Sequence, residues 1–560
     1  MFAAIMSRER NFKNDYAEYW WHLDVGGIAG YAQLTTRSLR AAQSYYADLN
    51  DNRVMACTEL LSSYFYGHNS DFRELPLMED LVAGMTDAEK ADNQIYITIA
   101  KMVRGYRASK AVDLFNSVPY SEGLKGTAGQ FFPKFDDPAE IYKSIITDLG
   151  TLPDLLTDMA NKMSPDGKRI FSQQDIIFKG DINKWQQWAA GIRLRLAVRI
   201  SGVEEAFART AISDIIAKGN LPTSDIYVSA DAWITKDGAH WKLGLNERDY
   251  AAFFSASFMY RLDRDMDHIY TPGSDDPRLP VFCLPNRDTL YMPMSYDFLI
   301  GDKIQLYVQA DNKAKYGYND AYFRYNYFSE VDRYLKYNHF CLYSPTTFVR
   351  NAAPFRAITA AEVDFLLAEV ALKGLAGSGN SAENHLKNGV INSINYWYDQ
   401  NATSNWDKVT DANRSFLKPT RPDQAILDQF ANKVVADFTR AGSQDEKLGV
   451  IITQKYVHLN IQDFIEVFAE LRRTRYPKLA IIKYGGALAL KPVVERFPYP
   501  GSETASNTEA VNAVASQNDF ITPIFWVPAS KRGEEYYEKS FNDIYMYNRY
   551  KGVPESFKGF

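Results

Sequence analysis

Helical spacing of apolar residues runs through two long stretches of the chain, residues 90–220 and 356–480. Residues three or four positions apart share one face of an α-helix, so this spacing predicts helices that each bury one stripe. Residues 221–355, which separate the two stretches, hold no long helical period. We therefore expect a mainly α-helical fold with long irregular loop regions and little β structure.

Start and stop signals place the predicted helices of the first stretch. Apolar residues at i, i+4, i+7 and i+11 indicate a helix over about residues 93–115. In "FDDPAEIYKSIITDL", Asp137 is in the N-cap position and Pro138 is the first helical residue. A third helix opens at Asp181 in "GDINKWQQWAAGIRLRLAVRIS", and a fourth ends at Gly219. The four helices form two consecutive pairs.

Helices resume in the second stretch. In "ITAAEVDFLLAEVALKG", Thr359 and Glu362 have the spacing of a capping box. Two more helical segments follow, "SAENHLKNGVINSINYW" and "IITQKYVHLNIQDFIEVFAELRRTRYPKL". The alternation of helix pairs predicts tetratricopeptide-like (TPR-like) stacking into a right-handed superhelical scaffold. The fixed repeat of about 34 residues is absent, so the chain is TPR-like without being a TPR array.

Charge and composition exclude some classes of protein. The net charge is -6 and the two signs are well mixed, so no basic surface for nucleic acid is expected. Cys57, Cys283 and Cys341 lie far apart and are expected to be buried small hydrophobes. No apolar run reaches the roughly 18 residues that span a bilayer. The first residues, "MFAAIMSRER", do not resemble a secretion signal.

The sequence carries no strong catalytic or metal motif. No phosphate-binding glycine loop, zincin motif or serine-hydrolase elbow is present. Asp263, Asp265 and Asp267 alternate as at the start of an EF-hand loop, but His268 and Ser274 occupy positions that need glycine and glutamate. We expect no required metal and no cofactor, with a loop calcium as the alternative. A carboxylate pair for glycoside cleavage can come from distant segments, so a hydrolase stays open.

Aromatic residues make up 14% of the chain, and several lie in aperiodic polar segments. A sugar offers a C–H face that stacks on a ring and hydroxyls that bind amides, guanidinium groups or carboxylates. Packing in the core is the competing interpretation for each of these aromatics. The candidate ligand-binding residues are Trp233, Trp241, Tyr64, Tyr66, Asn69, Arg73, Tyr291 and Tyr296.

Six segments in order resemble the SusD/RagB family of nutrient-binding outer-membrane lipoproteins of Bacteroidetes. They are "DLFNSVPYSEGL", "PKFDDPAEIYKSIITDL", "DIIFKGDINKWQQWAAGIRLRLAVRIS", "DDPRLPVF", "AEVDFLLAEVALKG" and "ITQKYVHLNIQDFIEVFAELRRTRYPKL". The chain departs from the family pattern at two places. It has Phe115, Asn116 and Ser117 where members usually read Tyr-Gly-Asp, and Arg475 where a glycine is common.

The resemblance implies one SusD-like domain over residues 1–560 that binds a glycan or another nutrient without catalysis. It also implies that the protein passes its ligand to a SusC-like TonB-dependent transporter at the outer membrane. Membrane attachment would be through an N-terminal lipid anchor that this sequence does not carry. Residues 221–355 would lie on the ligand side, and residues 530–560 form a tail without explanation. The alternatives are a TPR-like protein-interaction scaffold and a glycoside hydrolase.

Overall fold

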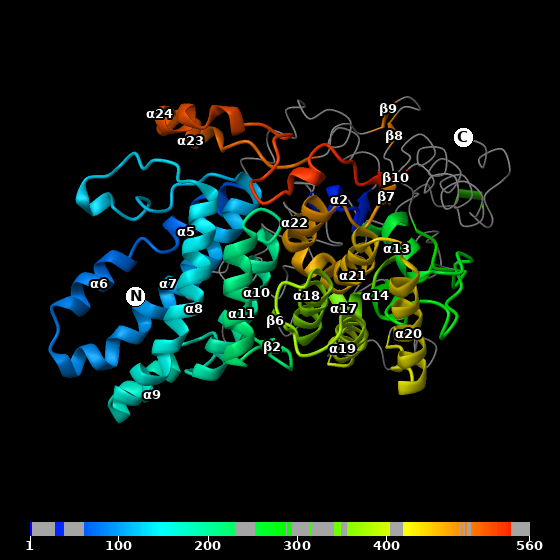
Figure 1. Ribbon diagram of the computed structural model, residues 1–560, viewed down its shortest axis with the longest axis horizontal. Coiled ribbons are helices and arrows are strands. Elements are labelled where there is room, and N and C mark those ends of the chain that lie inside the picture. Colours follow the sequence, from blue (N-terminus) through cyan, green and yellow to red (C-terminus); the bar gives the residue numbers. More distant parts are fainter. Residues whose placement is uncertain are drawn as a thin grey trace.

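The computed structural model is a row of helices that stand side by side along its longest axis (Figure 1). This arrangement confirms the mainly helical, TPR-like fold predicted from the sequence. The structure describes residues 1–2, 28–37, 61–229, 252–286, 288–293, 313–314, 341–348, 356–403, 418–480, 483–484, 488–489 and 494–538.

The first half of the row begins and ends its helices largely where the sequence signals lie. It contains α5 (Ser62–Ser70), α6 (Leu75–Ala83), α7 (Asp87–Phe115), α8 (Pro138–Lys162), α9 (Pro165–Gln174), α10 (Ile182–Ile200) and α11 (Glu205–Lys218). Helix α7 starts earlier than predicted because Thr86 and Glu89 form a full capping box. Asp137 and Asp181 cap α8 and α10 as predicted, and Gly219 ends α11 in a left-handed conformation.

The second half contains α18 (Ala360–Lys373), α19 (Ala382–Ala402), α20 (Gln424–Arg440), α21 (Gln444–Leu459) and α22 (Phe464–Thr474). The 3-10 turn η8 (Asn460–Asp463) connects α21 to α22. The predicted capping box of α18 is wrong in its second half. The Thr359 hydroxyl accepts the Glu362 N–H, but the Glu362 carboxylate accepts hydrogen bonds from Arg195 of α10 instead of returning to the N-cap.

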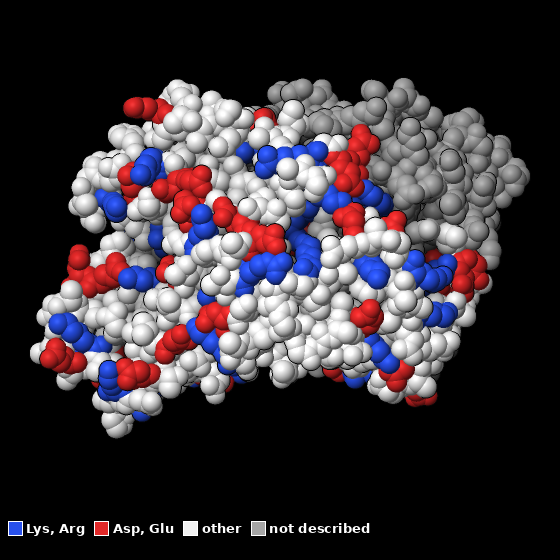
Figure 2. Space-filling model, in the orientation of Figure 1, with Lys and Arg blue, Asp and Glu red and all other residues white. Residues whose placement is uncertain are grey.

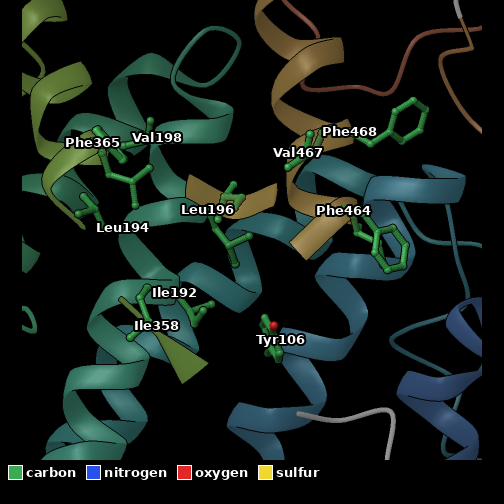
Figure 3. Close-up of a cluster of buried hydrophobic side chains, with 14 of the residues drawn as sticks. Tyr106, Ile192, Leu194, Leu196, Val198, Ile358, Phe365, Phe464, Val467 and Phe468 are labelled. Atoms are coloured by element: carbon green, nitrogen blue, oxygen red, sulfur yellow. The ribbon is translucent and has the colours of Figure 1, made fainter. Parts of the chain in front are cut away.

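Helix α10 joins the two halves, because it packs against α8 on one side and α18 on the other. Figure 3 shows the apolar core at this junction, with side chains from α7, α10, α18, α22 and strand β6 (Arg356–Ile358). Gly191 permits the close approach of β6, since an added Cβ would lie 2.6 Å from Ile358 Cδ1. The two halves of the helix row are far apart in sequence, and this direct packing joins them.

Charged side chains also lie inside this junction. The Arg195 guanidinium donates two hydrogen bonds to Glu362, at 2.6 and 2.7 Å. Arg199, one turn further along α10, donates to Asp113 of α7 and Glu466 of α22. All five side chains are buried. Since a buried charge is tolerated only when it is paired, these contacts fix how three helices meet α10.

The β structure is small. A four-stranded sheet has the order β1 (Thr35–Arg37), β3 (Ala252–Phe254), β5 (Leu342–Tyr343) and β4 (Cys283–Leu284), and its neighbours are antiparallel. The two-stranded pairs are β2 (Ile226–Tyr227) with β6, β7 (Leu479–Ala480) with β10 (Tyr537–Glu538), and β8 (Lys483–Tyr484) with β9 (Leu488–Ala489). The remaining short helices are α2 (Ile28–Tyr31), α13 (Ala256–Leu262), α14 (Leu279–Phe282), α17 (Pro345–Phe348), α23 (Gly501–Ser506) and α24 (Thr508–Ala513).

The first residues of the C-terminal tail belong to the packed body. Strand β10 pairs in parallel with β7, and Lys531 donates a hydrogen bond to Asp445 of α21. Just before the tail, the buried Trp526 indole donates to Asp113 at 2.9 Å. Residues 530–538 therefore close one side of α21 and α22, and the rest of the tail lies outside the described residues.

Candidate functional site

A turn over residues 263–276 links α13 to α14, and its aspartates hold its shape. Asp275 accepts hydrogen bonds from the backbone N–H groups of Arg264, Asp265 and Thr271. Asp263 is buried and accepts the N–H of His268. Asp263, one of the alternating aspartates that resemble a calcium loop, therefore holds the backbone of this turn in place. Among the residues that the structure describes, no group of three His, Cys, Asp or Glu could hold a metal ion.

One side of this turn forms a cavity of roughly 420 Å³, which we call the tyrosine–proline pocket. Its other walls are the start of α14, the end of α19 and the start of α20, at the right of Figure 1. The lining residues are Tyr270, Pro272, Pro280, Tyr291, Tyr398, Pro419, Thr420, Arg421, Pro422, Asp423 and Ile426. A volume of this size is within the range of small-molecule sites, which are typically lined by aromatic and apolar groups.

Three tyrosines give the pocket its aromatic surface. The Tyr398 hydroxyl donates to the Pro277 carbonyl at 3.0 Å, which fixes that ring. The Tyr270 hydroxyl is enclosed and has no hydrogen-bond partner among the described residues. Burial raises the pKa of Tyr270, Tyr291 and Tyr398, so all three phenols are neutral at physiological pH. Neutral phenols can both donate to and accept from a ligand hydroxyl.

Charged groups lie at the start of α20. The Arg421 guanidinium donates to Asp399 at the end of α19 and is 39% exposed, so it remains open to a ligand. Asp423 is in the N-cap position of α20, but its carboxylate makes no capping hydrogen bond there. The pocket therefore offers a donor and an acceptor beside rings and prolines. This combination suits a polyol with an apolar C–H face.

The structure places the predicted residues of α5 away from this pocket, at the opposite end of the helix row (Figure 1). Tyr64 is fully buried, with the Arg107 guanidinium 4.6 Å from its ring centre. The Tyr66 hydroxyl lies 3.2 Å from Ser502 Oγ of α23, and the Tyr66 side chain is half-buried. No sugar can reach the Tyr64 ring in this arrangement.

Asn69 and Arg73 have different surroundings. The Asn69 amide donates to the Pro119 carbonyl at 2.7 Å and accepts from Arg104 at 3.0 Å, so it holds the "VPYSEG" turn against α7. Arg73 is 74% exposed and lies 3.1 Å from Glu74. Tyr120 of the same turn lies under the Arg104 guanidinium, at 4.4 Å. The contacts of Asn69 are those of a structural residue, whereas Arg73 is accessible.

Of the predicted ligand residues, Tyr291 is the one that lines the tyrosine–proline pocket. Trp233, Trp241 and Tyr296 lie outside the described residues. Sequence reasoning missed Tyr270, Tyr398 and Arg421. Their signal is weak: Tyr270 stands in the proline–glycine turn "YTPGSDDP", and Arg421 stands in the proline-rich "KPTRPDQ" before a helix. Tyr398 lies on a predicted helix and resembles a core residue.

Charges of both signs lie on the surface of the described residues. Lys and Arg are interspersed with Asp and Glu over the face in Figure 2, and the described residues show no extended area of one sign there. In the part of the chain described, no helix has both the length and the apolar character needed to cross a bilayer.

Fold and pocket together define a helical, TPR-like protein with an aromatic cavity. A family model described as "Starch-binding associating with outer membrane" matches residues 1–500. The chain belongs to this SusD-like family, which confirms the resemblance noted in the sequence.

Solved structures show the same fold. The chain is similar to a chitin-binding protein, with 21% identity, a TM-score of 0.63, and coverage of 94% of this chain and 100% of that one. A SusD homologue from Bacteroides vulgatus has 17% identity, a TM-score of 0.64, and coverage of 95% and 98%. A SusD homologue from Bacteroides fragilis has 17% identity, a TM-score of 0.62, and coverage of 94% and 99%. No curated protein matches the chain.

Proposed function

We propose that this protein binds a glycan at the cell surface and passes it, without catalysis, to a SusC-like TonB-dependent transporter. A lipid anchor would hold the protein at the outer membrane. Membership in a family described as starch-binding and associating with the outer membrane supports the ligand class and the location. The similarity to a chitin-binding protein supports a saccharide ligand as well.

The observation that carries the proposal is the tyrosine–proline pocket. It combines three rings, four prolines, one guanidinium group and one carboxylate in one cavity. Tyr270 is half-buried, so part of its ring is accessible to a ligand in the pocket, while its hydroxyl is enclosed. We propose that a neutral sugar ring stacks on the tyrosines while Arg421 and Asp423 bind its hydroxyls. Trp233 and Trp241 remain proposed contributors from outside the described residues.

Binding to a panel of neutral glycans, measured by calorimetry, tests this proposal. We expect Tyr270→Ala and Arg421→Gln each to weaken the affinity of the best glycan about tenfold, which corresponds to about 1.4 kcal/mol. Phe131→Ala is the matched control, because Phe131 is a 73% exposed aromatic on the α7–α8 connection. The melting temperature of each variant separates lost binding from lost folding.

Unchanged affinity in both pocket variants would remove the tyrosine–proline pocket from the proposal. The same two measurements on Trp233→Ala and Trp241→Ala then show whether those tryptophans form the site. Release of reducing sugar ends by the pure protein would favour the hydrolase alternative. An affinity for no glycan in the panel would contradict the ligand class itself.

A further inference from the structure

A second cavity, of roughly 480 Å³, lies on the other side of the turn over residues 263–276, and we call it the arginine cavity. The end of α13, the middle of α20, α21 and residues 476–478 enclose it. Its lining residues are Tyr260, Arg261, Arg264, Met266, Val434, Asp437, Glu446, Gly449, Val450, Thr453, Gln454, Tyr476, Pro477 and Lys478. The tyrosine–proline pocket has no residue in common with it.

Gln454 provides a hydrogen-bond donor at the floor of the arginine cavity. Its side chain is 93% buried, since only 7% of it is exposed. Its Oε1 accepts from Arg278 at 2.6 Å, and Arg278 is itself held by Asp276 through two hydrogen bonds. This contact fixes the orientation of the amide, so the N–H₂ group points the other way. That group makes no hydrogen bond to a described residue, so it can donate to an acceptor in the cavity.

Two arginines stand beside this donor. The Arg264 guanidinium donates from Nη2 to Asp437 at 2.6 Å, while its Nε–H and Nη1–H groups make no hydrogen bond within the described residues. The Arg261 guanidinium donates to the Ser257 carbonyl and to the Lys478 carbonyl, which hold it at the cavity wall. Because one Arg264 nitrogen is held by Asp437, the remaining N–H groups of this fixed guanidinium can donate to a carboxylate.

Tyr476 forms a rigid aromatic wall. An added Cβ at Gly449 would lie 2.7 Å from the Tyr476 ring, so the ring rests directly on the backbone of α21. The Tyr476 hydroxyl donates to Asp445 at 3.2 Å, and Tyr260 lies on the same cavity. These two rings offer a surface for a pyranose ring beside the cationic groups.

We propose that the arginine cavity binds an acidic saccharide, with the sugar carboxylate on Arg264 and the Gln454 amide and the sugar ring against Tyr476. The ligand carries a single negative charge per sugar. The lining has three cationic side chains and the carboxylates of Asp437 and Glu446, and these two carboxylates repel a phosphate dianion more strongly than a carboxylate. The inference rests on the proposed function only in taking a saccharide as ligand, because it concerns a different cavity and a different sugar class.

Calorimetry with digalacturonate and with its neutral counterpart galactobiose tests the inference on the full chain. We expect the wild type to bind digalacturonate at least tenfold more tightly than galactobiose, and the difference to shrink as salt rises. Arg264→Gln and Gln454→Glu should each weaken digalacturonate binding at least tenfold. Gln454→Glu keeps an acceptor for Arg278 and replaces the cavity donor by a carboxylate oxygen. The matched control is Arg440→Gln, because Arg440 also pairs with Asp437 but lies outside the cavity and is 74% exposed.

The outcomes separate this inference from the proposed function. Equal binding of the two sugars, no measurable binding of digalacturonate, or equal losses in Arg264→Gln and Arg440→Gln would overturn it. Loss of digalacturonate binding in Tyr270→Ala with no loss in Arg264→Gln would move the acidic sugar to the tyrosine–proline pocket, which overturns the inference and leaves the proposed function standing. Binding of digalacturonate without binding of any neutral glycan would leave the inference standing and overturn the proposed neutral-glycan site. Melting temperatures identify any variant that fails to fold.

Discussion

At the scale of single residues, Asn116 and Arg475 stand where the family resemblance leads us to expect glycine, and both have positive φ, 71° and 63°. Each side chain compensates with contacts that glycine cannot make. The Asn116 amide donates to Gln517 Oε1 at 2.6 Å, and its oxygen accepts the Phe525 N–H at 2.8 Å. Arg475 donates to the Lys531 carbonyl and to Glu495. Both residues tie helix ends to the C-terminal segment.

The first prediction concerns Asn116. Asn116→Gly removes two hydrogen bonds of about 1 kcal/mol each but relaxes the backbone, whereas Asn116→Ala removes the same bonds and keeps a Cβ at positive φ. We expect Asn116→Ala to lower the free energy of unfolding by about 1 to 2 kcal/mol more than Asn116→Gly does. Urea unfolding of the two variants gives the difference directly. Equal losses would show that the backbone is not strained at this residue.

The sequence identified the residue types of the candidate site better than their positions. Tyr64 and Tyr291 lie in similar aromatic, polar segments, yet Tyr64 is covered by the Arg107 side chain and Tyr291 lines a cavity. The difference comes from which distant segments fold over each ring. Tyr398 is a buried core residue, and the prolines that line the pocket with it arrive from residues 419–422. No local pattern contains that information.

At the scale of elements, helix ends could be predicted well because they depend on nearby residues. Asp137, Asp181 and Gly219 act as the sequence indicates, through contacts within a few positions. Glu362 does not complete the capping box that the sequence predicts, because its carboxylate binds Arg195, which is 167 positions away. A local capping contact is weaker than a pair of charge-assisted hydrogen bonds, so the Glu362 carboxylate binds Arg195 instead of the N-cap.

The second prediction tests this pair, which connects α10 to α18. Arg195→Met leaves the Glu362 carboxylate buried without its cationic partner, and such a loss costs about 3 to 5 kcal/mol of unfolding free energy. The double variant with Glu362→Met as well should recover most of that loss, because two apolar side chains replace the pair. Arg169→Met on α9 is the control, since the Arg169–Asp166 pair is exposed and its loss costs about 1 kcal/mol or less. A double variant no more stable than Arg195→Met would contradict this account.

At the scale of the whole molecule, buried histidines couple stability to pH. Burial, together with the nearby Arg104, lowers the pKa of His68 from 6.5 to about 3. Burial also holds the pKa of His458 well below its usual value, together with Arg356 and Arg278. Below pH 6.5 the unfolded chain binds protons at both rings, while the folded protein does not. Stability is therefore lost as the pH falls, not as it rises.

The third prediction is that the unfolding free energy decreases below about pH 6.5, by about 1.4 kcal/mol per pH unit for each histidine. A further decrease is expected below the ordinary range of glutamate. Burial opposes ionisation of Glu466, but Arg199, Lys455 and Arg195 outweigh it and hold its pKa well below the usual value. Urea unfolding at several pH values from 7 to 4 measures the slope. His68→Gln should reduce that slope by about half between pH 6.5 and 5, and an unchanged slope would exclude His68 as its source.

The contact between Trp526 and Asp113 has a consequence for the order of folding. The indole N–H and the carboxylate are 413 positions apart, although both lie in the body of the helix row. Until residue 526 has been made, Asp113 at the end of α7 has Tyr142 and Arg199 as donors but lacks the Trp526 indole. Long-range contacts of this kind form late and slowly. The packing around the end of α7 is therefore completed only after residue 526 has been made, so folding of this part of the helix row follows synthesis of a distant segment.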